Sequence, residues 1–500
     1  MPFKKLLESC EHLLDEMHID KLEDLGLDRI LESYFLVGPY PPLMQMDEYR
    51  WNEHSFEIKE SKSNGFVDLY IHFPYCRVVG KYECTFCPYY KEKYVSSVES
   101  EIVENWINEI KLYKKIIGDF KVSTIYFGGG TVSLITPENL KNFVDYLDEH
   151  IGLENCLEVK FEIHADSSKE PEKLYGILDV LKIFNNLKLI IDIQSLNPQT
   201  LNYVSWGRIS SEIYFQTLNM VIKKGFKHIC TSLILGLPFE TPESFLEGVS
   251  KLASIPEIEA LNIYPLMFRE CDDVFKCLKH SQEIMFDVKT RDVVYLAARK
   301  FLRSFDFSES PIYFYSRGKT KPKHQLNKFE SESSLIGIGP SAFGHINSTN
   351  LNIAYYNLAS VTKYGEQLDK QRLPFWKVYN LSENSKYIRK IVKGLNMLKN
   401  FNINMLNGNL REKLEVAFNI FQVHGLIEKE SDEWTLTDKG ILRVEEMSYY
   451  LAEIDLGQKL TAYTNETAKE PYHCFPYRTE EQVSKWKVEY QNYVCKPDEE

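Results

Sequence analysis

Three cysteines lie close together in one short stretch of the sequence. Cys76, Cys84 and Cys87 occur in YIHFPYCRVVGKYECTFCPYY, directly after the strand-like run Val67 to Phe73. A metal cluster needs several soft thiolates, and a loop that leaves a rigid strand supplies them because its backbone is free of a regular ladder. Closed structural zinc sites normally have four ligands, so three thiolates leave one metal position open for a substrate or cofactor. The spacing predicts an iron–sulfur site with redox or radical chemistry, and His72 offers the alternative of a zinc site with three cysteines and one histidine.

The elements that must position these cysteines alternate between short apolar runs and stretches of helix length, from about residue 67 to 266. Strands that alternate with helical crossovers lie parallel in one sheet. Six such units are too few for the closed eight-stranded barrel, so we expect a partial, open barrel that keeps its functional groups at the C-terminal ends of the strands. The expected strands are Val67–Phe73, Val122–Phe127, Leu157–His164, Leu187–Ile193, His228–Leu235 and Ala260–Leu266, and the expected helices include Glu99–Ile117, Pro137–His150 and Thr241–Ser254.

Polar or glycine-rich residues follow five of these strands. The cysteine loop follows the first strand, and the GGGT run from Gly128 to Thr131 follows the second. Glu162 and His164 close the third strand, Gln194 follows the fourth, and the GLP run at 236–238 follows the fifth. Because the C-terminal ends of the strands form one face of such a barrel, we expect these residues to line a single mouth.

The segments on either side of the barrel have other patterns. Residues 1–66 predict a helical extension and then an extended arm around VGPYPPLMQ (37–45), where the prolines disfavour helix. Residues 67–380 predict the barrel with a C-terminal barrel extension, in which the glycines of GIGPSAFG (337–344) indicate a close backbone approach. Residues 381–455 follow the order helix, helix, strand, turn, strand, helix, which is that of a winged-helix unit. Residues 456–500 form an aromatic-rich tail that we expect to pack on the body and cover the barrel mouth, with Cys474 or His473 near the substrate.

The overall composition is typical of an intracellular enzyme. The chain has 500 residues, 44% of them hydrophobic, and a formal net charge of −13. This acidity argues against nucleic acid or an anionic membrane as a partner. No stretch of about 18 uncharged apolar residues predicts a membrane span, so we expect a soluble, cytoplasmic protein. The ten cysteines are mostly single, which does not suggest a disulfide framework.

The order of the motifs resembles that of radical S-adenosylmethionine (SAM) enzymes of the HemN-like group, the oxygen-independent coproporphyrinogen III oxidase-like proteins. The resemblance extends from about residue 40 to 452 and implies an α/β fold, a partial (β/α)6 radical SAM barrel followed by a HemN-like C-terminal domain. The motifs that carry it, in family order, are DLYIHFPYC, IYFGGGTVSLI, FEIHAD, DIQSLNPQTL, WGRISSE, LILGLPFET, LNIYPL, GIGPSAFGH and HGLIE.

The resemblance implies one [4Fe–4S] cluster and one or two molecules of SAM as cofactors. Cys76, Cys84 and Cys87 would bind three irons, and the amino and carboxylate groups of SAM would bind the fourth. An electron from the reduced cluster would cleave SAM to methionine and a 5′-deoxyadenosyl radical. Tyr70 on the first strand matches the family's tyrosine near the sulfonium of SAM.

The resemblance also implies further SAM contacts. Phe86 would stack near the adenine, and the glycine run would bring backbone groups to the methionine end, which glycine permits because it has no Cβ. Glu162 would accept hydrogen bonds from the ribose hydroxyls or the amino group, Gln194 would reach the ribose, and Arg208 would pair with the carboxylate. Simple strand-end packing of Gln194 and a surface ion pair of Arg208 are the alternatives. The residues carried over for SAM binding are Phe86, Gly128, Gly129, Gly130, Thr131, Glu162, Gln194 and Arg208.

Three departures from the family pattern bear on the reaction. Seven residues, 77–83, separate the first two cysteines where the family has three, and Ser232 stands where the family has an aspartate before LIxGLP. The fourth cysteine that closely follows the triad in porphyrinogen oxidases is absent after Cys87. We therefore expect radical hydrogen abstraction that leads to methyl or methylene transfer to an organic substrate in specialised biosynthesis.

Two alternatives to methyl transfer stay open. One is oxidative decarboxylation, or another hydrogen abstraction, on a tetrapyrrole-like or other organic acid. The other is a non-enzymatic haem- or metal-binding chaperone, since one branch of the family resembles carriers. The expected partners of an enzyme are a small-molecule substrate and an electron donor such as flavodoxin or ferredoxin.

Overall fold

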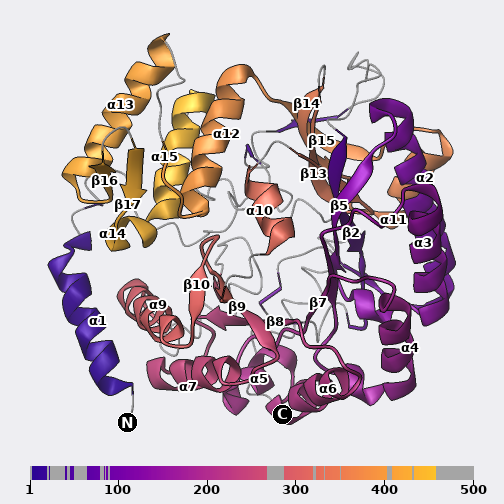
Figure 1. Cartoon of the computed structure of the whole chain (residues 1–500), viewed down its shortest axis with the longest axis horizontal. Helices are drawn as coiled ribbons and strands as arrows, with labels where there is room; N and C mark the ends of the chain where they lie inside the picture. Colours follow the sequence, from indigo (N-terminus) through magenta and orange to yellow (C-terminus); the bar gives the residue numbers. More distant parts are fainter. Residues whose placement is uncertain are drawn as a thin grey trace, which may run out of the picture.

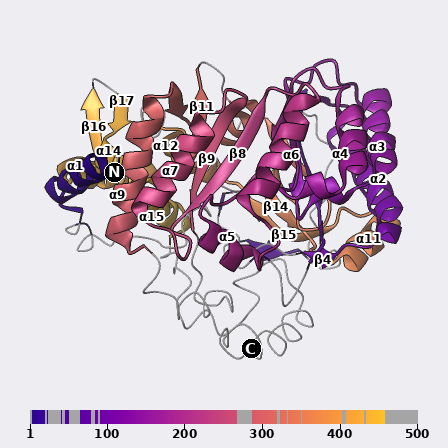
Figure 2. The same cartoon turned by 90° about the horizontal axis from the view of Figure 1, so that it is seen from below.

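The computed structural model describes residues 3–19, 22, 40–41, 46–49, 65–78, 84, 86–87, 91–266, 286–318, 322–330, 333–348, 351–401, 408–430 and 433–457. Within these residues thirteen strands form one curved sheet, with helices along its outer side (Figures 1 and 2). The strand order is β1-β15-β14-β13-β12-β2-β5-β6-β7-β8-β9-β11-β10. None of the helices in the described stretches is both long and apolar enough to cross a membrane.

The six strands that the sequence predicts are all present, and they are neighbours in chain order in the middle of the sheet. Each adjacent pair among them is parallel. They are β2 (Phe66–Phe73), β5 (Lys121–Gly129), β6 (Glu158–Glu162), β7 (Leu187–Ile190), β8 (Ile229–Leu235) and β9 (Ile258–Pro265). The expected α/β fold with a parallel strand–helix barrel is therefore confirmed. Three strands end earlier than predicted, β6 at Glu162, β7 at Ile190 and β9 at Pro265.

The crossover helices lie on the outer side of these strands (Figure 1). They are α2 (Glu99–Ile117), α3 (Pro137–His150), α4 (Pro171–Leu181), α5 (Pro198–Ser205), α6 (Ser211–Lys223) and α7 (Pro242–Ala253). The predicted bounds of α2 and α3 are confirmed. Helix α7 begins one residue later than predicted because Thr241 is its N-cap, with a side chain that accepts a hydrogen bond from the Ser244 amide.

Further strands extend the sheet at both edges. Beyond β9 the chain adds β11 (Phe314–Arg317) and β10 (Phe307–Glu309), both antiparallel to their neighbours. At the other edge β12 pairs parallel with β2, and the remaining strands are antiparallel. The strands at this edge are β12 (Ser334–Ile338), β13 (Phe343–Asn347), β14 (Asn352–Asn357), β15 (Phe375–Asn380) and β1 (Asp47–Glu48), and the helices of these parts are α9 (Val288–Arg303), α10 (Lys323–Glu330) and α11 (Val361–Asp369).

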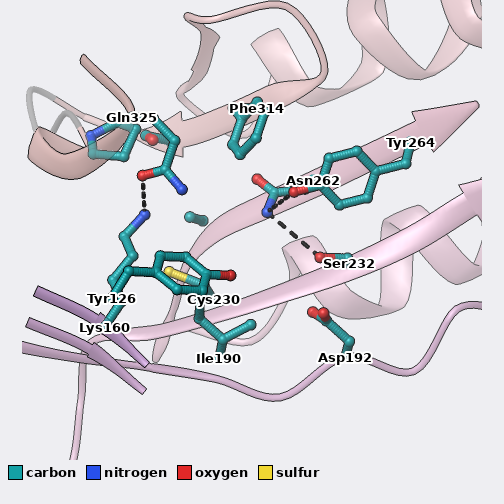
Figure 3. Close-up of a pocket in the computed structure, with 13 residues that line it drawn as sticks. Tyr126, Lys160, Ile190, Asp192, Cys230, Ser232, Asn262, Tyr264, Phe314 and Gln325 are labelled. Atoms are coloured by element: carbon teal, nitrogen blue, oxygen red, sulfur yellow. Dashed lines mark hydrogen bonds between the residues drawn. The ribbon is translucent and has the colours of Figure 1, made fainter. Parts of the chain in front are cut away.

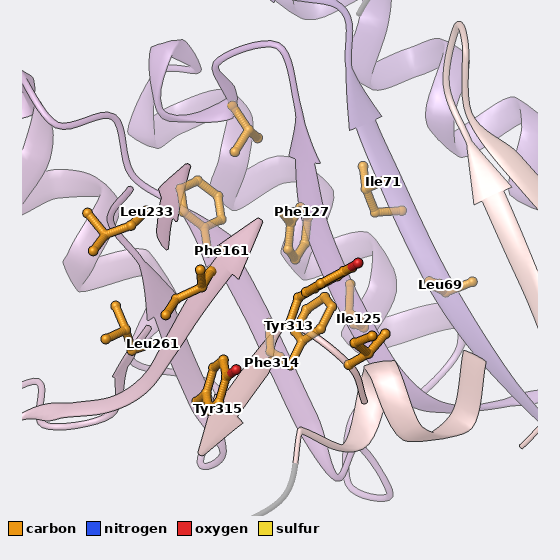
Figure 4. Packing of buried hydrophobic residues seen from close by; sticks show 14 of the residues in the cluster. Leu69, Ile71, Ile125, Phe127, Phe161, Leu233, Leu261, Tyr313, Phe314 and Tyr315 are labelled. Carbon is orange, nitrogen blue, oxygen red and sulfur yellow. The ribbon is translucent and has the colours of Figure 1, made fainter. Parts of the chain in front are cut away.

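The central strands have a different chemistry on each face. Leu69 and Ile71 on β2 belong to the main hydrophobic core, part of which Figure 4 shows. Alternate residues of a strand point to opposite faces, so Asp68, Tyr70 and His72 share the other face. Asp68 accepts hydrogen bonds there from Thr124 on β5 and from Asn327 on α10. The interior of the barrel is therefore polar, and α10 lies against it.

The C-terminal elements follow the predicted order of helix, helix, two strands and helix. They attach to the body through a buried ion pair between Arg443 and Asp292 on α9, 2.9 Å apart. The exact division at residue 380 stays a prediction. These elements are α12 (Glu383–Asn396), α13 (Gly408–Val423), β16 (Ile427–Glu430), β17 (Glu433–Leu436), α14 (Asp438–Ile441) and α15 (Val444–Leu456).

The N-terminal extension contains α1 (Lys4–Glu16), which packs on α9 through an ion pair between Lys289 and Asp15 at 2.8 Å. Most of the expected arm at 37–45 lies outside the described residues. Its Tyr40 is buried and donates a 2.7 Å hydrogen bond to Asp455 on α15. The aromatic tail from residue 458 onward, with His473 and Cys474, also lies outside the described residues.

Candidate cluster and cofactor site

The first of the three cysteines is held by a short two-stranded ladder. Cys76 belongs to β3 (Tyr75–Cys76), which pairs in parallel with β4 (Glu92–Lys93). The Cys76 carbonyl accepts a 2.9 Å hydrogen bond from the Tyr94 amide. Cys84 and Cys87 are joined by a turn in which the Cys87 amide donates to the Cys84 carbonyl at 3.2 Å. Phe86 lies within this turn and is half-buried, as the three cysteines are.

Basic and hydroxyl side chains surround the thiols. Burial raises the pKa of the Cys76 thiol to about 12, and the nearby Lys91 ammonium opposes this rise, whereas Cys84 and Cys87 add to it. Burial also raises the pKa of Cys84, and the Arg208 guanidinium opposes it. Arg208 donates a 3.5 Å hydrogen bond from Nη2 to Cys84 Sγ. The three sulfurs are therefore close enough to affect one another and are flanked by two cationic groups, which stabilise thiolates.

The glycine run at the end of β5 lies directly against the first cysteine. A Cβ on Gly130 would lie 2.5 Å from the Tyr75 carbonyl oxygen and 3.1 Å from Cys76 Sγ. Gly129 has φ +112°, and a Cβ there would lie 2.7 Å from the Phe73 carbonyl oxygen. Thr131 donates from its hydroxyl to Cys76 Sγ at 3.4 Å. The structure thus brings the GGGT motif and Cys76 together, and only glycine fits this approach.

An interior carboxyl group follows on the neighbouring strand. Glu162 Oε1 would lie 2.9 Å from a Cβ on Gly128, and it accepts a 2.6 Å hydrogen bond from the Tyr126 hydroxyl. Burial raises the pKa of Glu162 to about 8; the Tyr126 hydrogen bond opposes the rise and the nearby Asp192 adds to it. The Tyr70 ring lies 5.9 Å from the Tyr126 ring. Tyr126 therefore connects Tyr70 on β2 with Glu162 on β6.

Gln194 and the GIGPSAFG segment, both singled out in the sequence, lie beside these interior residues. Gln194 follows β7 with φ +71°, and its backbone N–H donates to the Ser232 backbone carbonyl at 3.1 Å. In GIGPSAFG, the Phe343 ring lies 5.3 Å from the Tyr70 ring. A Cβ on Gly339 in the same segment would lie 2.4 Å from the His72 carbonyl oxygen. The expected close backbone approach of these glycines is confirmed, and the neighbour of Gly339 is β2.

The donor set suits an iron–sulfur cluster. The free thiols of Cys76, Cys84 and Cys87 interact with one another, Lys91 and Arg208 favour their charged form, and Gly130 leaves no side chain beside Cys76. No three His, Cys, Asp or Glu side chains within the described ranges meet as closely as one metal ion requires. A zinc ion would draw all its thiolates to about 2.3 Å, whereas each thiolate of a cluster binds a different iron. His72 Nδ1 lies 2.7 Å from the Tyr70 hydroxyl, with which it shares a hydrogen bond.

The interior contains several polar residues beyond those that the sequence predicts. Lys91, Tyr126 and Asp192 were not predicted, although each interacts with a predicted site residue. The signal that finds Tyr126 is the period of two along a strand, because it precedes Gly128 by two places on β5. Lys91 has no such signal, since its place depends on how the cysteine loop folds.

Comparisons with known proteins agree with this geometry. Residues 70–252 match the Radical SAM superfamily, and the chain therefore contains a radical SAM domain. The oxygen-independent coproporphyrinogen III oxidase of Escherichia coli (strain K12) is 21% identical over 390 residues, which cover 73% of this chain and 80% of that protein. The heme chaperone HemW of Buchnera aphidicola subsp. Schizaphis graminum (strain Sg) is 21% identical over 395 residues, covering 75% and 95%.

The fold of the chain is also similar to that of a solved structure from these relatives. The solved structure of E. coli coproporphyrinogen III oxidase, HemN, described as a radical SAM enzyme, superimposes with a TM-score of 0.68 at 17% identity. It covers 84% of this chain and 97% of that one. The chain thus contains a radical SAM domain, is homologous to both the oxidases and the HemW chaperones, and has a fold similar to that of HemN.

Proposed function

We propose that this protein is an enzyme that binds a [4Fe–4S] cluster through Cys76, Cys84 and Cys87 and cleaves SAM reductively. The observation that carries the proposal is the group of three interacting thiols at the mouth of the parallel barrel, where Thr131 contacts Cys76 and Arg208 contacts Cys84. When bound, the reduced cluster supplies one electron that splits SAM into methionine and a 5′-deoxyadenosyl radical, which takes a hydrogen atom from the substrate.

The chain's own residues bind and orient the cofactor. The backbone at Gly128 to Thr131 borders the methionine end, Phe86 the adenine, and Gln194 the ribose, with Tyr70 near the sulfonium. Arg208 pairs with the SAM carboxylate while it stays near Cys84. Because Glu162 has a pKa of about 8, it holds a proton in much of the free protein at neutral pH. An ammonium or two hydroxyls from SAM would favour its ionised form, so binding is accompanied by loss of that proton.

For the reaction, we propose methyl or methylene transfer to an organic substrate. Support comes from the long gap between the first two cysteines, which begins with Arg77. Arg77 forms an ion pair with Glu170, just before α4, so this side of the cysteine loop is tied to the barrel wall. A pocket that differs beside the cluster fits a substrate other than a porphyrinogen. An electron donor of the flavodoxin or ferredoxin kind would supply the electron.

The relatives favour two other candidates. Similarity to coproporphyrinogen III oxidases supports oxidative decarboxylation of an organic acid, and similarity to heme chaperones supports haem binding without turnover. Haem titration of the purified protein distinguishes the chaperone, because a chaperone binds haem whether or not SAM is cleaved.

Product analysis tests the proposal. After anaerobic reconstitution and reduction with dithionite, the protein should convert SAM to 5′-deoxyadenosine. The Cys76→Ala variant should lose this activity and the Cys156→Ala variant should keep it, since Cys156 is a half-buried cysteine away from the loop. S-adenosylhomocysteine formed beside deoxyadenosine, once a substrate is supplied, marks methyl transfer. Deoxyadenosine alone favours decarboxylation, and no cleavage of SAM contradicts the proposed enzyme.

A further inference from the structure

A small polar cavity lies inside the barrel (Figure 3). Its volume is about 20 Å³, which is enough for one water-sized group. Residues from six neighbouring strands, from the segment after β7 and from α10 border it. The polar residues that line it include Tyr126, Lys160, Asp192, Ser232, Asn262 and Tyr264.

Asp192 has an acceptor atom in this cavity that no described residue satisfies. Its Oδ1 is fully buried and has no hydrogen-bond partner in the described part of the chain. Its carboxyl group interacts with the Ser232 side chain, whose hydrogen bond lowers a pKa that burial raises to about 6. A buried acceptor without a donor destabilises the fold. A ligand group that donates a hydrogen bond to Asp192 Oδ1 would remove this cost.

The neighbouring side chains orient Asp192 but do not fill its free position. Asn262 donates from Nδ2 to Ser232 Oγ at 3.4 Å, so the Ser232 hydroxyl proton is directed toward another acceptor. Figure 3 shows Asn262, Ser232 and Asp192 following one another along this side of the cavity. Lys160 donates a hydrogen bond to Gln325 on α10 and forms an ion pair with Glu158 at 3.7 Å. Its ammonium group therefore interacts with these residues and not with Asp192 Oδ1.

The cavity adjoins the proposed cofactor site. Tyr126 borders the cavity and donates its hydroxyl to Glu162, and the Asp192 carboxyl lies close enough to Glu162 to interact with its charge. Asp192 also precedes Gln194 by two residues. Two carboxyl groups at adjacent strand ends, one of them with an acceptor lacking a donor, suit a ligand that offers hydroxyl or ammonium groups.

We infer that Asp192 is a further cofactor-binding residue, which accepts a hydrogen bond from a hydroxyl or ammonium group of SAM while Ser232 and Asn262 hold it in place. This inference rests on the proposed function. The ribose diol and the amino group of SAM share the required donor chemistry, and binding of SAM fragments distinguishes them.

The test is equilibrium binding to the anaerobically reconstituted protein, measured by calorimetry without turnover. Asp192→Asn should weaken binding of S-adenosylhomocysteine by tenfold or more. An equal loss for 5′-methylthioadenosine, which has the ribose but no ammonium, assigns the contact to a hydroxyl. An unchanged affinity for 5′-methylthioadenosine assigns it to the ammonium. An Asp192→Asn affinity for S-adenosylhomocysteine within twofold of the parent overturns the inference.

Two further variants separate binding from folding. Glu240→Gln is the matched control, because Glu240 is also a buried carboxyl group that accepts from serine hydroxyls, at 2.5 Å from Ser195 and 2.9 Å from Ser244, but it does not line the cavity. Glu240→Gln should bind S-adenosylhomocysteine with an affinity within twofold of that of the parent. The double variant Asp192→Asn with Ser232→Asp returns a carboxyl group from the adjacent strand and should recover part of the lost affinity. If the parent itself binds no S-adenosylhomocysteine, the proposed function fails together with this inference.

Discussion

Replacing Gly130 by alanine tests how closely the end of β5 lies against the cysteine strand. The new Cβ would lie 2.5 Å from the Tyr75 carbonyl oxygen, 2.9 Å from its carbon and 3.1 Å from Cys76 Sγ. The carbonyl is held by a 2.8 Å hydrogen bond from the Thr131 amide, so moving it away weakens that bond. Overpacking together with a weakened hydrogen bond should lower the free energy of unfolding by about 2–4 kcal/mol.

Urea unfolding under reducing conditions, followed by circular dichroism, measures this change, with Gly394→Ala as the control. Gly394 is in α12, and a Cβ there meets no atom within 4 Å. The same chemical change should therefore raise the free energy of unfolding by about 0.4–1 kcal/mol. Gly130→Ala should also retain less iron after reconstitution, because it displaces Cys76. If Gly130→Ala is as stable as the parent, the described packing of β5 against β3 is refuted.

Three other substitutions address the interior and the attachment of the C-terminal elements. The pKa of Glu162 is about 8 in the folded protein, against the usual 4.5 of a glutamate in the unfolded chain. Between these two pH values the folded protein keeps a proton that the unfolded chain loses, so the free energy of unfolding of the parent falls as the pH rises. Glu162→Gln should not show this fall. If the difference in free energy of unfolding between Glu162→Gln and the parent does not grow from pH 4.5 to 8, the raised pKa of Glu162 is contradicted. Asp68→Ala removes a buried carboxyl group that accepts hydrogen bonds from Thr124, Asn327 and Ser333, and urea unfolding should show a loss of about 2–4 kcal/mol. Arg443→Ala removes the guanidinium that lies 2.9 Å from the buried Asp292 carboxylate and should lower the free energy of unfolding by about 3–5 kcal/mol. The double variant Arg443→Met with Asp292→Leu should be more stable than Arg443→Ala in the same assay, and equal stability would argue against a buried pair.

The central strands were predictable because short runs rich in apolar residues alternate along the chain with stretches of helix length, which is the pattern of a parallel sheet with helical crossovers. The predicted bounds of α3 are correct because its limits are local, with Thr136 as N-cap and Pro137 in the first turn. The end of β7 was predicted too late for a physical reason. Ile191 and Ile193 are fully buried although the ladder stops at Ile190, so the apolar run continues beyond the strand.

The candidate site was predictable from local spacing, from the residues at the strand ends and from the family resemblance, which supplied Arg208. The spacing of Cys76, Cys84 and Cys87 and the glycine run after β5 are local patterns, and the structure brings them together. Asp192 and Ser232 are 40 positions apart and meet only through the pairing of the chain after β7 with β8. Contacts of this kind depend on strand register, which no short motif records.

Electron paramagnetic resonance of the reduced, anaerobically reconstituted protein, recorded with and without SAM, tests whether the three cysteines hold a cluster with one open iron. The proposal predicts about four irons per chain, a reduced-cluster signal whose g values change when SAM is added, and loss of that signal in Cys84→Ala. A protein that binds zinc and no iron, or a signal that SAM leaves unchanged, would contradict it.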